Sequence, residues 1–121
     1  MLLKRPVLLA AMLALMPLAA PAALAHAILV DSLPAPEGSI AAGHVVLTLR
    51  YNSRIDRDRS RLTLMPENGE QTRLPIADGT PPDVLRTEAD LTPGSYTLRW
   101  QVLAIDGHIT RGNVPFTVTG K

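Results

Sequence analysis

The chain contains no cysteine. This absence excludes disulfide bonds, thiolate metal sites, thiol redox chemistry and cysteine nucleophiles. Any metal would have to be bound by nitrogen, by oxygen or by the thioether sulfur of methionine. A small domain without disulfides depends on its hydrophobic core for stability, which favours a compact β or α/β fold.

A surplus of charge is also missing. The chain has 12 basic and 11 acidic residues, a formal net charge of +1. Two of the basic residues, Lys4 and Arg5, belong to a predicted signal peptide, and their removal leaves ten basic and eleven acidic residues, a charge of −1. A chain without a basic surplus gives no indication of binding to nucleic acid or anionic lipid.

The N-terminal segment has the three parts of a secretory signal. Lys4 and Arg5 are followed by an apolar run at residues 7–15, and Ala23-Leu24-Ala25 is an A-x-A cleavage pattern. The apolar run is too short for a bilayer, which needs about 20 apolar residues. Residues 1–25 are therefore predicted to be removed, and the working protein is predicted to be residues 26–121, one small domain of 96 residues.

A second cleavage site remains open. Ala25-His26-Ala27 also fits A-x-A, and a cut after Ala27 would make Ile28 the first residue. The earlier cut is favoured, and it is the one that leaves His26 at the N-terminus.

After the signal, the pattern is that of short strands separated by turns, without helical periodicity. A short opening segment at 26–30 is followed by predicted strands at 44–51, 62–65, 84–89, 95–103 and 114–118. Six or seven short strands in fewer than 100 residues predict an antiparallel β-sandwich. Pro115 indicates that the last strand is an edge strand or irregular. The charged segment 54–61, with four arginines and two aspartates, is expected to be a solvated loop or an edge.

Two of the three histidines stand at positions suited to a metal. A first-residue His26 offers its α-amine and its imidazole Nδ1 to one ion, and an α-amine pKa of about 7.7–8.0 makes the proton easy to displace near neutral pH. His108 supplies a third nitrogen, and Asp106, two residues earlier in the same loop, supplies an oxygen. Three nitrogens and one oxygen in tetragonal geometry suit Cu(II).

The alternative for each residue is an ordinary structural role. A single loop histidine is more often solvated than ligating, and Asp-Gly is by itself a turn signal. His44, at the start of a predicted strand, is expected to be exposed and not to bind metal.

Residues 26–39 (HAILVDSLPAPEGS) begin with histidine, and Ser32 to Ser39 follow with the pattern S-x-P-A-x-x-G-S. Near the other end, residues 91–100 (LTPGSYTLRW) are followed by Asp106-Gly107-His108 and by residues 112–118 (GNVPFTV). These two ends of the mature chain resemble the opening and the closing strands of the CopC-type copper-binding domain family.

This resemblance implies a seven-stranded, antiparallel, immunoglobulin-like β-sandwich with Greek-key connections that binds one Cu(II) ion per chain in the bacterial periplasm. It maps the copper ligands to His26, Asp106 and His108. It also implies sequestration or delivery of copper, sometimes with a membrane copper permease, by a protein that is neither an enzyme nor, in its mature form, embedded in the membrane.

The chain departs from the family pattern at three positions. Ser53 stands where many members have glutamate, and Ala104 where serine is common. Met65 is the single methionine after the signal, so the methionine-rich Cu(I) loop of some members is not expected here.

Two other functions remain open. One is a metal-free interaction module, a common use of small sandwiches. The other is a copper oxygenase with an N-terminal histidine brace, but the chain has only four aromatic residues for a flat substrate face.

Overall fold

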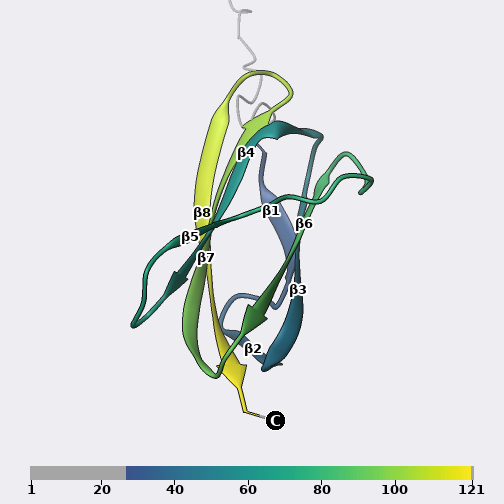
Figure 1. Cartoon of the computed structure of the whole chain (residues 1–121). Helices are drawn as coiled ribbons and strands as arrows, with labels where there is room; N and C mark the ends of the chain where they lie inside the picture. Colours follow the sequence, from purple (N-terminus) through teal and green to yellow (C-terminus); the bar gives the residue numbers. More distant parts are fainter. Residues whose placement is uncertain (1–26, 121) are drawn as a thin grey trace, which may run out of the picture.

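The computed structural model describes residues 27–120, so the predicted signal at 1–25, His26 and Lys121 lie outside the described residues. Eight strands form two sheets that pack face to face as an immunoglobulin-like sandwich (Figure 1). The strands are β1 (Leu29–Leu33), β2 (Gly38–Ala41), β3 (Gly43–Tyr51), β4 (Ile55–Pro66), β5 (Thr72–Leu74), β6 (Val84–Leu91), β7 (Gly94–Ala104) and β8 (Ile109–Thr119). Within the described residues there is no helix long and apolar enough to cross a membrane.

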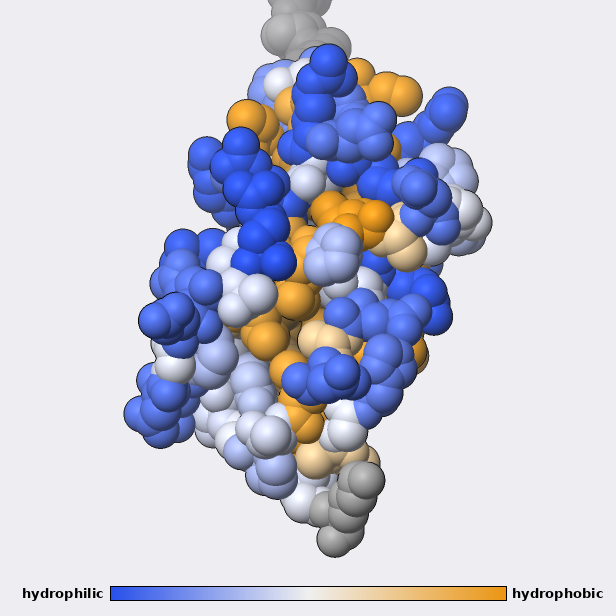
Figure 2. Space-filling view, in the orientation of Figure 1, coloured by the Kyte–Doolittle hydropathy of each residue, from blue (hydrophilic) through white to orange (hydrophobic). Residues whose placement is uncertain are grey.

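The smaller sheet has the order β1-β3-β6, and the larger has the order β2-β8-β7-β4-β5. Each sheet has a long central strand whose alternate side chains face the other sheet, as the period-two pattern predicts. Val45, Leu47 and Leu49 of β3 and the matching positions of β7 are almost fully buried. Figure 2 shows the seam between the sheets as an apolar line with hydrophilic side chains on both sides.

The two sheets are joined at the core by an aromatic contact. Tyr51 of β3 meets Trp100 of β7 edge to face, with ring centroids 5.2 Å apart and an interplanar angle of 73°. Such a pair contributes about 0.5–1.5 kcal/mol beyond the burial of its surface. The prediction that Trp100 belongs to the core is confirmed.

The expected sandwich is confirmed, but the strand count of seven and the wholly antiparallel pairing are wrong. The structure has eight strands, and β2 runs parallel to β8, from Gly38 beside Phe116 to Ala41 beside Thr119. The short β2 follows a turn that ends at Glu37. With four residues, none of them fully buried, β2 carries little hydrophobic signal of its own.

Of the two expectations for segment 54–61, a solvated loop or an edge, the structure agrees with the edge. Most of the segment lies in β4, where Ile55 pairs with Ala104 and Arg61 pairs with Gln101 of β7, while β5 pairs with β4 only from Leu62 on. The register shifts between Asp56 and Arg61, and such an irregularity accommodates extra residues in a strand. Charged residues, some of them half-buried, therefore occupy a bulged strand.

The expectation that Pro115 marks an edge strand is also corrected, because β8 lies between β7 and β2. The Pro115 carbonyl accepts a hydrogen bond from the Glu37 N–H at 2.7 Å. In a strand, the N–H and C=O of one residue point to the same side, so the donor that proline lacks faces β2 and not β7. Pairing with β2 begins only at Phe116, and the missing donor is tolerated there.

Candidate metal centre

The β7–β8 connection is a short loop that carries Asp106 and His108 at one end of the sandwich (Figure 1). Its closure is tight, because the Ala104 N–H donates to the His108 carbonyl at 2.7 Å and the Gly107 N–H donates to the Ala104 carbonyl at 2.9 Å. Gly107 has a φ of +94°, a conformation that glycine adopts without a steric penalty. The Asp-Gly pair therefore forms a turn, as its sequence indicates, and this turn presents two possible ligands.

Asp106 contacts His108 with both carboxylate oxygens. Its Oδ1 accepts the His108 backbone N–H at 3.1 Å, and its Oδ2 lies 3.0 Å from His108 Nδ1. The backbone N–H of His108, with help from its imidazole, holds the pKa of the Asp106 carboxyl below its usual value. The carboxylate is therefore anionic at neutral pH and directs the imidazole ring.

This arrangement gives the two ring nitrogens of His108 different roles. With Nδ1 directed toward a carboxylate, Nε2 is the nitrogen placed to bind a metal. A carboxylate on the second nitrogen is the usual partner of a metal-binding histidine, because it sets the ring's tautomer and orientation and raises its basicity. Asp106 can thus support a metal at Nε2 through His108, whereas an oxygen of its own, which lies on the Nδ1 side of the ring, would reach the same ion only if the ring turned.

The chain enters the sandwich at the same end. Ala27 is fully buried, and Ile28 is tied to Asn52 by two hydrogen bonds. The Ile28 N–H donates to Asn52 Oδ1 at 2.8 Å, and the Asn52 N–H donates to the Ile28 carbonyl at 2.9 Å. Asn52 follows β3 directly, three residues before β4 begins at Ile55, and Ile55 pairs with Ala104 beside the loop. The described chain thus begins at the end of the sandwich that carries Asp106 and His108.

The structure describes two of the three predicted ligands. Asp106 and His108 are brought together as expected, whereas His26 lies outside the described residues, directly before Ala27. Within residues 27–120, no three histidine, aspartate or glutamate side chains are grouped so as to hold a metal. Asn52 was missed from the sequence, since an asparagine after a strand is an ordinary turn residue.

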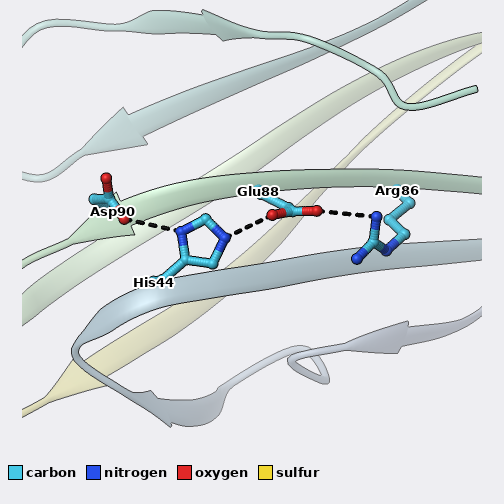
Figure 3. A network of polar contacts seen from close by, with 4 residues as sticks. All are labelled: His44, Arg86, Glu88 and Asp90. Atoms are coloured by element: carbon cyan, nitrogen blue, oxygen red, sulfur yellow. Dashed lines mark hydrogen bonds and ion pairs between the residues drawn. The ribbon is translucent and has the colours of Figure 1, made fainter.

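His44 lies at the opposite end, near the start of β3, in a polar network of its own (Figure 3). Its Nδ1 is 2.9 Å from Asp90 Oδ1 and its Nε2 is 2.6 Å from Glu88 Oε1, while Arg86 contacts the other oxygen of Glu88 at 3.0 Å. The hydrogen bonds that the His44 ring donates to Asp90 and Glu88 raise its pKa. Because the two carboxylates lie on different ring nitrogens, one ion cannot bind His44 and both of them. The expected exposure of His44 is confirmed, with 60% of its side chain accessible.

Comparisons with known proteins agree with this architecture. Residues 29–119 match the family model described as the CopC domain. Protein YobA of Escherichia coli K12 is 28% identical over 105 residues, covering 84% of this chain and 85% of that protein.

Two solved structures share the fold. The crystal structure of CopC from Methylosinus trichosporium OB3b superposes with a TM-score of 0.72 at 28% identity, over 78% of this chain and 95% of that one. The methionine-rich copper resistance protein PcoC of Escherichia coli superposes with a TM-score of 0.68 at 24% identity, over 78% of this chain and 100% of that one. With a family model that matches all eight strands and a sandwich of the same kind, this chain belongs to the CopC domain family.

Proposed function

We propose that this protein binds one Cu(II) ion in the periplasm through His26, Asp106 and His108, and that it sequesters copper or passes it on. The observation that carries the proposal is the Asp106–His108 pair in the β7–β8 loop, at the end of the sandwich where the chain enters through Ala27. Family membership and the copper resistance role of PcoC support copper as the cargo.

The donor set explains the choice of ion. The α-amine and imidazole of His26, an imidazole nitrogen of His108 and an oxygen of Asp106 would give three nitrogens and one oxygen, a set that suits tetragonal Cu(II). Because the Asp106 oxygens lie on the Nδ1 side of the ring, the imidazole would turn when both residues bind the ion. Signal cleavage after Ala25 creates the α-amine, so export and completion of the site would be one event. The proposal assigns Ile28 and Asn52 the task of holding the first residues at this end.

We propose binding and transfer in place of catalysis. Trp100, Tyr51 and Phe116 are buried in the core, and Tyr96 is half-buried against Phe116. These residues are all of the chain's aromatics, and none is placed on a flat surface where a polysaccharide could stack. The cargo has to come from and go to other copper-handling proteins, of which a membrane copper permease is one.

The intact mass of the exported protein, measured with and without Cu(II), tests cleavage and stoichiometry together. We expect the mass of residues 26–121 alone and a gain of one copper ion. His26→Ala, or a glycine added before His26, should abolish tight binding in a Cu(II) titration, whereas the control His44→Ala should leave it unchanged. Undiminished binding in both N-terminal variants would overturn the proposal, as would a mature protein that begins at Ile28.

A further inference from the structure

The outer face of the five-stranded sheet carries four arginines at neighbouring positions on four strands. Arg61 of β4 and Arg111 of β8 flank Gln101 of β7 in one row of the sheet. In the next row, Arg73 of β5 and Arg99 of β7 flank Thr63 of β4. We call Arg61, Arg73, Arg99 and Arg111 the arginine face.

The register fixes how close these cations are. Neighbouring strands lie about 4.8 Å apart, and alternate residues on one strand about 6.8 Å apart. The backbone positions of all four arginines therefore fall within roughly three strand spacings. Like charges directly opposite each other destabilise a sheet, and here a neutral polar residue separates the two arginines in each row.

None of the four arginines has a carboxylate partner within residues 27–120. The ion pairs of the described chain engage other arginines: Arg50 with Asp31, Arg59 with Asp56, and Arg86 with Glu88. Arg111 donates through Nε to Gln101 Oε1 at 2.8 Å, which orients its guanidinium without neutralising it. All four are exposed, so the face carries uncompensated positive charge although the protein is nearly neutral.

A groove of about 440 Å³ runs from this face toward the end of the sandwich that carries His108. Its lining includes Arg59, Arg61, Arg73 and Gln101, and also Leu103 and Ile109, which pair with each other beside the β7–β8 loop. Asp58 is the carboxylate among the lining residues. Ile109, which directly follows His108, exposes 51% of its surface. The groove thus joins a cationic part to an apolar part.

We propose that this groove and the arginine face dock an extended acidic segment of a partner protein, with carboxylates on the arginines and an apolar side chain against Leu103 and Ile109. Arginine is suited to this role because its planar guanidinium binds carboxylates through two parallel hydrogen bonds. The docked segment would end beside the β7–β8 loop. The inference is independent of the copper proposal and holds for metal-free protein.

The observations favour a polypeptide over two other occupants. A bilayer surface does not enter a groove, and the side chains between the arginines are Gln101 and Thr63, with no apolar anchor. A second copy of the chain would have to offer an acidic face. The acidic side chains of the three-stranded sheet, Asp31, Glu88 and Asp90, are already paired within the chain.

The test uses metal-free mature protein and a labelled eight-residue peptide of alternating aspartate and threonine with leucine at one end. We expect saturable binding that weakens as salt screens the charges, with amide shifts confined to β4, β5, β7 and β8. The double variant Arg61→Gln/Arg99→Gln should bind about tenfold more weakly, a change of about 1.4 kcal/mol. The matched control Arg50→Gln/Arg86→Gln removes the same charge from the other sheet and should bind as wild type does.

Three results would overturn the proposal. The first is equal binding of the peptide in which asparagine replaces aspartate. The second is an equal loss in both double variants, which would mean that only net charge matters. The third is tighter binding to vesicles of phosphatidylglycerol and phosphatidylcholine than to the peptide, which would assign the face to a bilayer. Copper titration is not involved, so a failed metal site leaves this outcome unaffected.

Discussion

Gly112 of β8 lies directly under the indole ring of Trp100. A Cβ built on Gly112 would overlap the ring carbons Cζ2 and Cε2 and would stand 3.0 Å from Nε1. The two residues are register partners on adjacent strands, and the ring is held from the other sheet by Tyr51. At this position a hydrogen is the largest side chain that the core accepts.

Gly112→Ala should therefore lower the free energy of unfolding by about 1–3 kcal/mol, the usual cost of overpacking a well-filled core. Urea unfolding followed by tryptophan fluorescence measures the change. Gly120→Ala is the matched control, because a Cβ there meets nothing within 4 Å. A stability of Gly112→Ala equal to that of the control would show that the ring moves aside at no cost.

His44 should titrate above its ordinary pKa of 6.5, because hydrogen bonds donated to Asp90 and Glu88 favour the protonated ring. A pKa raised by folding means that protonated His44 stabilises the folded state at pH below 6.5. This contribution is lost as the pH rises through the folded-state pKa. The same contact lowers the pKa of Glu88, whose contribution is instead lost as the pH falls through its folded-state value.

An NMR titration of the His44 ring checks this expectation. In the double variant Glu88→Gln/Asp90→Asn the pKa should fall back toward 6.5. A wild-type pKa at or below 6.5, or no change in the variant, would contradict the network.

At the scale of elements, the start of β1 is fastened to the connection between β3 and β4 by Asn52. Its side-chain oxygen accepts the Ile28 N–H, and its backbone N–H returns a bond to the Ile28 carbonyl. The element that leads to His26 is thus held by a side chain from another strand connection. Loss of these two hydrogen bonds should therefore affect a metal site at the first residue more than it affects the stability of the core.

Asn52→Ala should weaken Cu(II) binding severalfold, while global stability falls by only about 0.5–1.5 kcal/mol for one lost hydrogen bond. Hydrogen exchange at the Ile28 amide should accelerate at the same time. Asn68→Ala in the exposed β4–β5 turn is the control. Copper affinity that is equal in the two variants would show that the first residues are positioned by other contacts.

At the scale of the whole molecule, copper bound as proposed would join the free start of the chain to the loop between two central strands. A ligand that binds only the folded state stabilises it by about 2.7 kcal/mol when its free concentration is a hundred times the dissociation constant. The unfolded chain keeps the amine and imidazole of His26, so the gain here should be smaller than that figure.

Thermal unfolding with and without Cu(II) should therefore show a higher midpoint for the wild-type protein. His108→Ala removes the ligand that depends on the fold, and its midpoint should not rise with copper. An equal rise in both proteins would mean that the ion is held by the N-terminus alone.

Most of the sandwich could be predicted from local pattern. Alternation over 44–51 and 95–103 matches β3 and β7, because strands with one buried face carry a period-two signal. Segment 54–61 was predicted as a loop or an edge, because its charge pattern gives no sign of the bulged strand that it forms beside β7. The short β2 and β5 were missed because strands of three or four residues show too little alternation to be recognised.

The sequence by itself determined the strand-rich core, the absence of thiolate ligands and the nearness of Asp106 to His108, since these follow from residue type and short spacing. Only the tertiary structure decided three further matters. It placed Asn52 against Ile28, directed Nδ1 of His108 toward Asp106, and gathered four arginines from four strands onto one face. The physical reason is that contacts between residues far apart in the chain depend on strand order and register, which arise from the packing of the whole sandwich.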